Sequence, residues 1–183
     1  MAFLDPDGVA EMGFSSVGEN VLISDRASFY NCRNIRIGNN VRIDDFCILS
    51  AGAKGINIGD YVHIASYCSL IGSALIELKE FSGLSSRVSI YSSSDDYSGT
   101  YMTNPTVPDE LTNVAHADVT IGKHVIVGSG SVVLPGVILE EGVAIGALSL
   151  VSKSCQAFGI YSGVPAKRIK ERKKNIKDLE NLV

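Results

Sequence analysis

A six-residue period runs through most of this 183-residue chain and limits its fold more than any other feature. The segments VGENVLI, IGNNVRI, IGDYVHI and IGKHVIV begin at Val17, Ile37, Ile58 and Ile121, and each has glycine in its second position. A large aliphatic residue then recurs every six positions, without loss of register in the series Ile121, Val127, Val133, Leu139, Ile145, Val151. Neither an amphipathic helix nor an alternating hairpin strand has this period. The sequence therefore predicts short strands joined by corners and stacked as a solenoid.

The spacing of the repeat predicts the shape of one coil. The starts at Val17, Ile37 and Ile58 are separated by three six-residue units plus a corner insertion of two or three residues. Three short strands per turn make a triangular coil, which buries little until neighbouring coils stack on it. About six coils can be drawn, and the one that begins near Leu78 lacks the glycine but keeps the aliphatic columns. Tryptophan is absent and aromatic residues make up 7% of the chain, so the core is expected to be aliphatic.

Cysteine and histidine positions follow the same repeat. No C-x-x-C pair occurs, and small, buried, reduced thiols are expected at Cys32, Cys47, Cys68 and Cys155. The repeat places His63 on an outward-facing strand position and His124 at a solvent-exposed corner. Neither histidine is assigned a function on this pattern.

Charge and hydropathy exclude several classes of protein. The formal net charge is −4, which argues against nucleic-acid or anionic-membrane partners although the segment KRIKERKKNIK is locally basic. The amino terminus lacks a signal-peptide pattern, and no segment approaches a membrane span. A soluble cytoplasmic protein is expected.

The segment IGKHVIVGSGSVVLPGVILEEGVAIGALSLVSKS, followed by GVPAKRIK, resembles the galactoside, maltose and xenobiotic acetyltransferase branch of the hexapeptide-repeat acyltransferases. Within that branch it is most similar to members that act on bacterial surface-polysaccharide sugars. The resemblance implies an all-β solenoid, a left-handed parallel β-helix over residues 1–164. The spacing of Ile169, Ile176, Leu179 and Leu182 fits one face of a helix, so a carboxy-terminal helix over 165–183 is expected to cap the last coil. The resemblance also implies a homotrimer that uses acetyl-CoA as cosubstrate and holds no metal.

A polar segment at residues 92–118 interrupts the repeat. A long loop inside a regular solenoid usually carries function, and in the family this excursion helps to form an active site between subunits. The family's usual catalytic histidine near the start of the loop is missing, and Asp95 and Asp96 stand there instead. The base is therefore His116 near the end of the loop, one of the two aspartates, or no dedicated residue because the acceptor is an amine.

The family resemblance also implies a CoA site beside the carboxy-terminal coils. Small residues that would let the pantetheine arm approach are Gly128, Ser129, Gly146, Ala147 and Ser149. Candidates for the phosphates are Lys153, Lys167 and Arg168, with Pro165 near the adenine. Packing of solenoid corners explains the small residues equally well, and the basic residues can be simply solvated.

The predicted function is acetyl-CoA-dependent N-acetylation of a nucleotide-linked amino sugar, by direct attack in a ternary complex, for bacterial surface polysaccharide (O-antigen) synthesis. The amine is preferred because it needs less help from a base than a hydroxyl does. The alternatives are a sugar O-acetyltransferase of the galactoside or maltose type and a non-catalytic solenoid scaffold. A carbonic-anhydrase-like metalloenzyme on the same fold requires three converging histidines, and His63, His116 and His124 do not have the required spacing.

Overall fold

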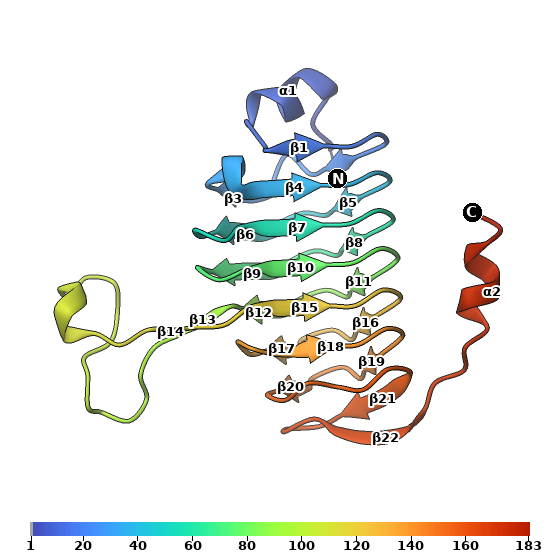
Figure 1. The fold of residues 1–183 in the computed structure, drawn as a ribbon. Helices are drawn as coiled ribbons and strands as arrows, with labels where there is room; N and C mark the ends of the chain where they lie inside the picture. Colours follow the sequence, from blue (N-terminus) through green and yellow to red (C-terminus); the bar gives the residue numbers. More distant parts are fainter. Residues whose placement is uncertain (1) are drawn as a thin grey trace.

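The computed structural model describes residues 2–183, which form a three-sided solenoid of about seven turns with one long arm (Figure 1). Each side is a sheet of parallel strands, apart from the last strand of one sheet, because every coil adds one strand to each side in turn. The front strands in Figure 1 run to the right while the coils descend, so the solenoid winds left-handed, as the family resemblance implied. No helix within residues 2–183 is long and apolar enough to cross a membrane.

The three sheets are numbered here by the order in which the chain enters them. The first sheet consists of β1 (Ser16–Val17), β4 (Ile35–Ile37), β7 (Ile56–Ile58), β10 (Ile76–Leu78), β15 (Val119–Ile121) and β18 (Ile138–Leu139). The second sheet consists of β2 (Leu22–Ile23), β5 (Arg42–Ile43), β8 (His63–Ile64), β11 (Gly83–Leu84), β16 (Ile126–Val127), β19 (Ala144–Ile145), β21 (Gly159–Ser162) and β22 (Lys167–Glu171). The third sheet consists of β3 (Ser28–Tyr30), β6 (Ile48–Ala51), β9 (Ser69–Gly72), β12 (Ser89–Tyr91), β17 (Val132–Val133) and β20 (Leu150–Val151).

Short helices and one hairpin complete the chain. The amino-terminal helix α1 (Pro6–Glu11) begins after Asp5, whose side chain accepts a hydrogen bond from the Gly8 N–H. Two 3₁₀ turns occupy η1 (Cys32–Asn34) and η2 (Asp109–Leu111), and α2 (Ile176–Glu180) lies near the carboxy terminus. The arm begins and ends in the antiparallel pair β13 (Ser93–Ser94) and β14 (Ala115–His116).

The core is the set of aliphatic columns that the six-residue period predicted. In the second sheet one column runs through fully buried residues of successive coils, namely Ile23, Ile43, Ile64, Leu84, Val127 and Ile145. The coil that begins near Leu78 is in register, since Leu84 pairs with Ile64 on one side and with Val127 on the other. Each buried aliphatic side chain contributes about 1.5–3 kcal/mol relative to exposure.

The corner between the first and second sheets requires left-handed backbone. Tyr61, Phe81 and His124 all have φ between 57 and 59°, which is uncommon for residues other than glycine. Their rings stack along the corner, with centroids 4.7 Å apart for Tyr61 and Phe81 and 5.2 Å apart for Phe81 and His124. Ring stacking therefore accompanies the strained backbone of this corner.

His124 lies at a corner, as predicted, but it is buried, so the expected solvent exposure is wrong. Its Nε2 lies 2.9 Å from Glu180 Oε2, and Glu180 also pairs with Lys123. Helix α2 thus covers the corner that the repeat alone would leave open. Hydrogen bonds from Lys123 and His124 hold the pKa of Glu180 below its ordinary value despite the opposing effect of desolvation, so this contact is lost as the pH falls through that lowered pKa.

The carboxy-terminal segment differs from the helix expected over 165–183. Residues Lys167–Glu171 form β22, which pairs antiparallel with β21, and only Ile176–Glu180 are helical. Without β22, strand β21 would present unpaired backbone groups at the end of the second sheet, and β22 pairs with them directly. The last coil is therefore covered by a strand, while α2 lies along the side of the solenoid (Figure 1).

Ser82 is a polar residue in an apolar column. It is buried at the corner position that Val62 and Val125 occupy in neighbouring coils, and its hydroxyl is the one buried side-chain polar atom without a partner in residues 2–183. A buried unpaired hydroxyl destabilises a fold, while added methyl groups in this column bury apolar surface. We expect Ser82→Val to raise the free energy of unfolding by about 1–2 kcal/mol in a urea titration. The matched reversal, Val62→Ser, is expected to lower it, and a less stable Ser82→Val variant would contradict this assignment.

Candidate active site

The arm leaves the solenoid without disturbing its register. Strand β10 pairs directly with β15, although 40 residues of chain separate Leu78 from Val119. Asp118 fixes the point where the chain re-enters the solenoid after the arm. Its Oδ1 accepts hydrogen bonds from the Leu75 N–H and from Lys54 Nζ, both at 3.0 Å. These hydrogen bonds, led by that from Lys54, hold the pKa of Asp118 below its ordinary value. The base of the arm is thereby anchored.

A hollow of about 530 Å³ lies where the arm meets the solenoid. Its lining is polar at the arm and small on the solenoid side, and comprises Asn31, Ser50, Ala51, Gly52, Ile71, Gly72, Ser73, Ser93, Asp95, Asn104, Pro105, Asp109, Thr112, Val114 and His116. A second hollow of about 380 Å³ lies on the other side of the arm and shares Asp95 and Ser93. Two of the three candidate bases, Asp95 and His116, therefore line one hollow.

The three candidate bases differ in how they are engaged. The His116 Nδ1 lies 2.7 Å from Ser93 Oγ across the β13–β14 pair. Asp96 Oδ1 accepts a hydrogen bond of 2.6 Å from the Ser98 N–H, and hydrogen bonds to Ser98 lower the pKa of its carboxyl. Asp96 thus holds a turn. The Asp95 side chain has no hydrogen-bond or ion-pair partner among residues 2–183, which leaves its carboxylate available to a ligand.

The small residues predicted to hold CoA lie at the corner between the second and third sheets. Ser129 and Ala147 are exposed there, but Ser149 is buried and its hydroxyl donates to the Gly146 carbonyl at 2.7 Å. A Cβ atom on Gly128 would lie 2.5 Å from the Ala147 nitrogen, so this glycine is required by coil stacking. Packing explains Gly128 and Ser149, while Ser129 and Ala147 remain accessible to a ligand.

The residues predicted to bind phosphate are exposed but lie in different places. Lys167 in β22 pairs with Ser162 at the end of the small-residue corner, and Pro165 is exposed in the preceding turn. Arg168 donates to Gln156 Oε1 at 3.1 Å and to Glu171, so part of its charge is already neutralised. Lys153 follows β20 and lies at the corner between the third and first sheets, apart from Lys167 within one chain.

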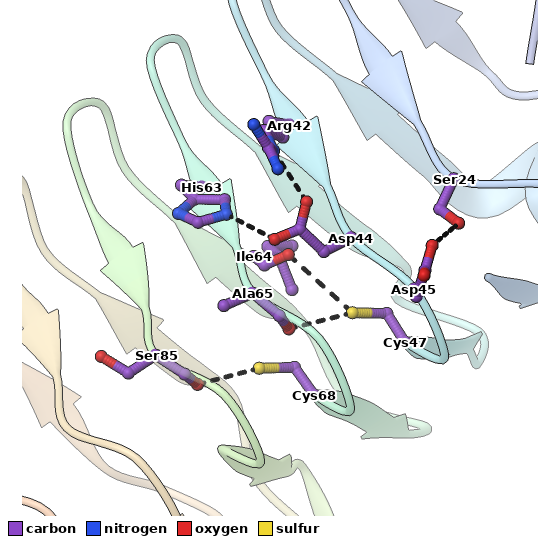
Figure 2. A network of polar contacts seen from close by, with 10 residues as sticks. All are labelled: Ser24, Arg42, Asp44, Asp45, Cys47, His63, Ile64, Ala65, Cys68 and Ser85. Carbon is purple, nitrogen blue, oxygen red and sulfur yellow. Dashed lines mark hydrogen bonds and ion pairs between the residues drawn. The ribbon is translucent and has the colours of Figure 1, made fainter. Parts of the chain in front are cut away.

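Two cysteines lie beneath the small-residue corner (Figure 2). The Cys47 Sγ donates to the Ala65 carbonyl and the Cys68 Sγ to the Ser85 carbonyl, both at 3.1 Å. Cys47, Cys68 and Cys155 are buried as predicted, and burial raises the pKa of the Cys155 thiol to about 11. Cys32 is only partly buried, because it begins a 3₁₀ turn outside the repeat.

A polar cluster on the outer face of the second sheet was not predicted. Asp44 is buried, its Oδ1 accepts from Arg42 Nε at 2.7 Å, and its Oδ2 accepts from His63 Nε2 at 2.9 Å (Figure 2). Burial raises the pKa of the Asp44 carboxyl, but the hydrogen bonds from Arg42 and His63 outweigh burial and hold it below its ordinary value. The sequence did contain a signal for this cluster, because Asp44 is a charged residue in a column that otherwise holds small residues such as Ala65 and Ser85.

The solenoid, the arm with its hollows and the small-residue corner together define a hexapeptide-repeat transferase. The family model described as bacterial transferase hexapeptide (six repeats) matches residues 118–153. The chain is 60% identical to the dTDP-4-amino-4,6-dideoxy-D-glucose acyltransferase of Escherichia coli over 182 residues, which cover 100% of this chain and 95% of that protein. The chain belongs to the hexapeptide-repeat acyltransferases.

Solved structures of two proteins, AntD and galactoside acetyltransferase, resemble this chain. A serine-to-cysteine variant of AntD, an N-acyltransferase from Bacillus cereus in complex with dTDP-4-amino-4,6-dideoxyglucose and coenzyme A, has 47% identity and a TM-score of 0.95 over 98% of this chain and 95% of that chain. AntD has also been solved with dTDP and 3-hydroxybutyryl-CoA. Galactoside acetyltransferase, at 20% identity and a TM-score of 0.61 over 95% of this chain and 76% of that chain, shares the fold.

Proposed function

We propose that the chain transfers an acyl group from acyl-CoA to the 4-amino group of dTDP-4-amino-4,6-dideoxyglucose. The E. coli relative is named for this acceptor, and AntD binds the same nucleotide sugar together with coenzyme A. The observation in this chain that carries the proposal is the Asp95 carboxylate, which faces the hollow at the arm and has no partner among residues 2–183. A carboxylate is a suitable acceptor for the hydrogens of a sugar amine.

The reaction proceeds by direct attack in a ternary complex. The neutral amine nitrogen attacks the thioester carbon, the C–N bond forms, and the C–S bond breaks. The proton lost by nitrogen passes by way of the Asp95 carboxylate to the departing sulfur, so CoA leaves as the thiol. Holding both reactants in one site supplies much of the rate enhancement for such a transfer.

A homotrimer with shared sites is part of this proposal. The arm extends away from the coils (Figure 1). It exposes several large apolar side chains, with Tyr97 93% exposed and Tyr101, Met102, Leu111 and Val114 also accessible. Exposed apolar side chains gathered on one segment usually mark an interaction surface. A neighbouring subunit would cover them and bring its own corner against the hollow at Asp95.

CoA binding is assigned to the corner that ends at Lys167. We expect Lys167→Glu to raise the KM for acyl-CoA by about tenfold, because it replaces a charge-assisted phosphate contact by repulsion. Arg168→Glu is expected to have a smaller effect, since Arg168 already pairs with Glu171. Initial rates at varied acyl-CoA, with the melting temperature as a control for folding, provide the measurement. An unchanged KM in both variants would remove this corner from the CoA site.

Acceptor choice tests the proposed function. CoA release is measured with an acyl-CoA donor and either the 4-amino sugar or dTDP-glucose, which carries a hydroxyl at the same carbon. We expect release with the amine only, and a rate that rises with pH as the ammonium form of the sugar loses its proton. Release with dTDP-glucose alone would instead support an O-acyltransferase, and release with neither acceptor would favour a scaffold.

A further inference from the structure

A groove of about 270 Å³ lies on the second sheet beside the unpredicted polar cluster. It is lined by His63, Ala65, Gly83, Leu84, Ser85, Ser86, Ile126 and Ser129. The groove exists because Gly83 has no side chain between His63 and Ile126, its neighbours on the adjacent strands. A Cβ atom placed on Gly83 would meet nothing within 4 Å, so neither strain nor packing requires glycine here.

His63 presents one defined nitrogen to this groove. A carboxylate can only accept hydrogen bonds, so the proton of the neutral ring is on Nε2, where it is donated to Asp44. The other ring nitrogen, Nδ1, then carries a lone pair, and it points away from Asp44 (Figure 2). Arg42 holds the opposite oxygen of the same carboxylate, which fixes the position of Asp44. The cluster therefore holds a single hydrogen-bond acceptor at the groove.

The groove continues the corner assigned to CoA. After the inward aliphatic residues of β11, β16 and β19, this corner carries a small pair, namely Ser85–Ser86, Gly128–Ser129 and Gly146–Ala147. Lys167 lies on β22, so five strand spacings of ~4.8 Å separate it from His63 on β8, about 24 Å in all. An extended pantetheine arm, together with the lysine side chain that reaches its phosphates, spans a comparable length. The acyl end of the donor would therefore lie near His63.

We infer that the groove is the acyl-chain site and that His63 selects donors whose acyl chain carries a hydroxyl group. This inference rests on the proposed function and names the class of its donor. An acyl hydroxyl donates to His63 Nδ1, whereas an unsubstituted chain in the groove covers this nitrogen without giving it a partner. Sites built around a polar contact discriminate strongly against analogues that lack the matching group. Asp44 is a positioning residue, since it acts through His63.

The test compares three donors with the 4-amino sugar as acceptor: 3-hydroxybutyryl-CoA, butyryl-CoA and acetyl-CoA. In the native enzyme, kcat/KM is expected to favour 3-hydroxybutyryl-CoA over butyryl-CoA by about tenfold. His63→Leu is expected to remove this preference while changing the rate with acetyl-CoA little. Equal use of the two four-carbon donors by the native enzyme would overturn the inference, as would an equal loss with all three donors in His63→Leu, which would place His63 at the reacting atoms instead.

A second variant tests the groove without touching the histidine. Gly83→Val fills the open space in β11 with a residue suited to a strand, so it is expected to fold normally and to exclude both four-carbon donors while sparing acetyl-CoA. Leu22→Ala, on the same sheet face two strands from His63, serves as the matched control and should leave donor preference unchanged. Undiminished turnover of butyryl-CoA by Gly83→Val would place the acyl chain elsewhere.

Measurements of acyl-CoA affinity test this inference independently of the proposed function. If no donor supports CoA release with the 4-amino sugar, the proposed function fails, but calorimetric titration still measures the affinity for each acyl-CoA. Tighter binding of 3-hydroxybutyryl-CoA than of butyryl-CoA, lost in His63→Leu, would support the acyl-chain site alone. Equal affinities of the native protein for both donors would overturn it.

Discussion

Replacing Asp95 by asparagine is expected to lower kcat/KM for the amino sugar by about 10²–10⁴-fold, the range found when a group that accepts a proton in the transition state is lost. The amide preserves the size of the side chain but removes the negative charge and proton-accepting ability. Because Asp95 is exposed and has no partner among residues 2–183, the substitution should leave the melting temperature unchanged. Initial rates at varied sugar concentration provide the measurement.

Two neighbouring variants distinguish Asp95 from the other candidate bases. Asp96→Asn weakens the turn at Ser98 and is expected to lower activity much less. His116→Gln retains a polar side chain beside Ser93. Its loss of activity is expected to lie between those of Asp96→Asn and Asp95→Asn. A large loss confined to His116→Gln would assign the base to His116 and contradict the role proposed for Asp95.

Replacing Leu139 by alanine is expected to lower the free energy of unfolding by about 2–5 kcal/mol, since the side chain is fully buried in a column where neighbours relax little. Ile138, the preceding residue of β18, is 48% exposed and provides a matched control in Ile138→Ala. Urea titrations of both variants at one protein concentration give the comparison. Equal losses in the two variants would contradict the inward and outward alternation that the six-residue period implies.

The regular part of the fold was predictable because its contacts repeat at a fixed sequence distance. Ile64, for example, packs between Ile43 and Leu84, which lie 21 residues before it and 20 residues after it. A column of this kind is visible in the sequence itself, and even the coil that lacks the repeat's glycine is in register. The excursion was equally visible as an interruption of the period, and the structure brings two of its three candidate bases, Asp95 and His116, to one hollow.

The remaining features depend on contacts that the repeat does not encode. His124 is in contact with Glu180, 56 residues later, on the helix that covers its corner. The spacing of Ile169 and Ile176 suggested a helix where β22 completes a sheet instead. The Asp44–His63 pair joins residues from successive coils, and such a pair becomes apparent only when the two strands lie side by side. The missing histidine in the excursion predicted an amine acceptor, and the E. coli relative is named for an amino sugar.

The most direct test of the account is the identity of the reaction product. The protein is incubated with an acyl-CoA and dTDP-4-amino-4,6-dideoxyglucose, and the nucleotide sugar is then analysed by mass spectrometry and NMR. The account predicts one acyl group per sugar, attached as an amide at the 4-nitrogen, with one CoA thiol released for each amide formed. An unmodified amino sugar, or an acyl group attached to a sugar oxygen, would contradict it.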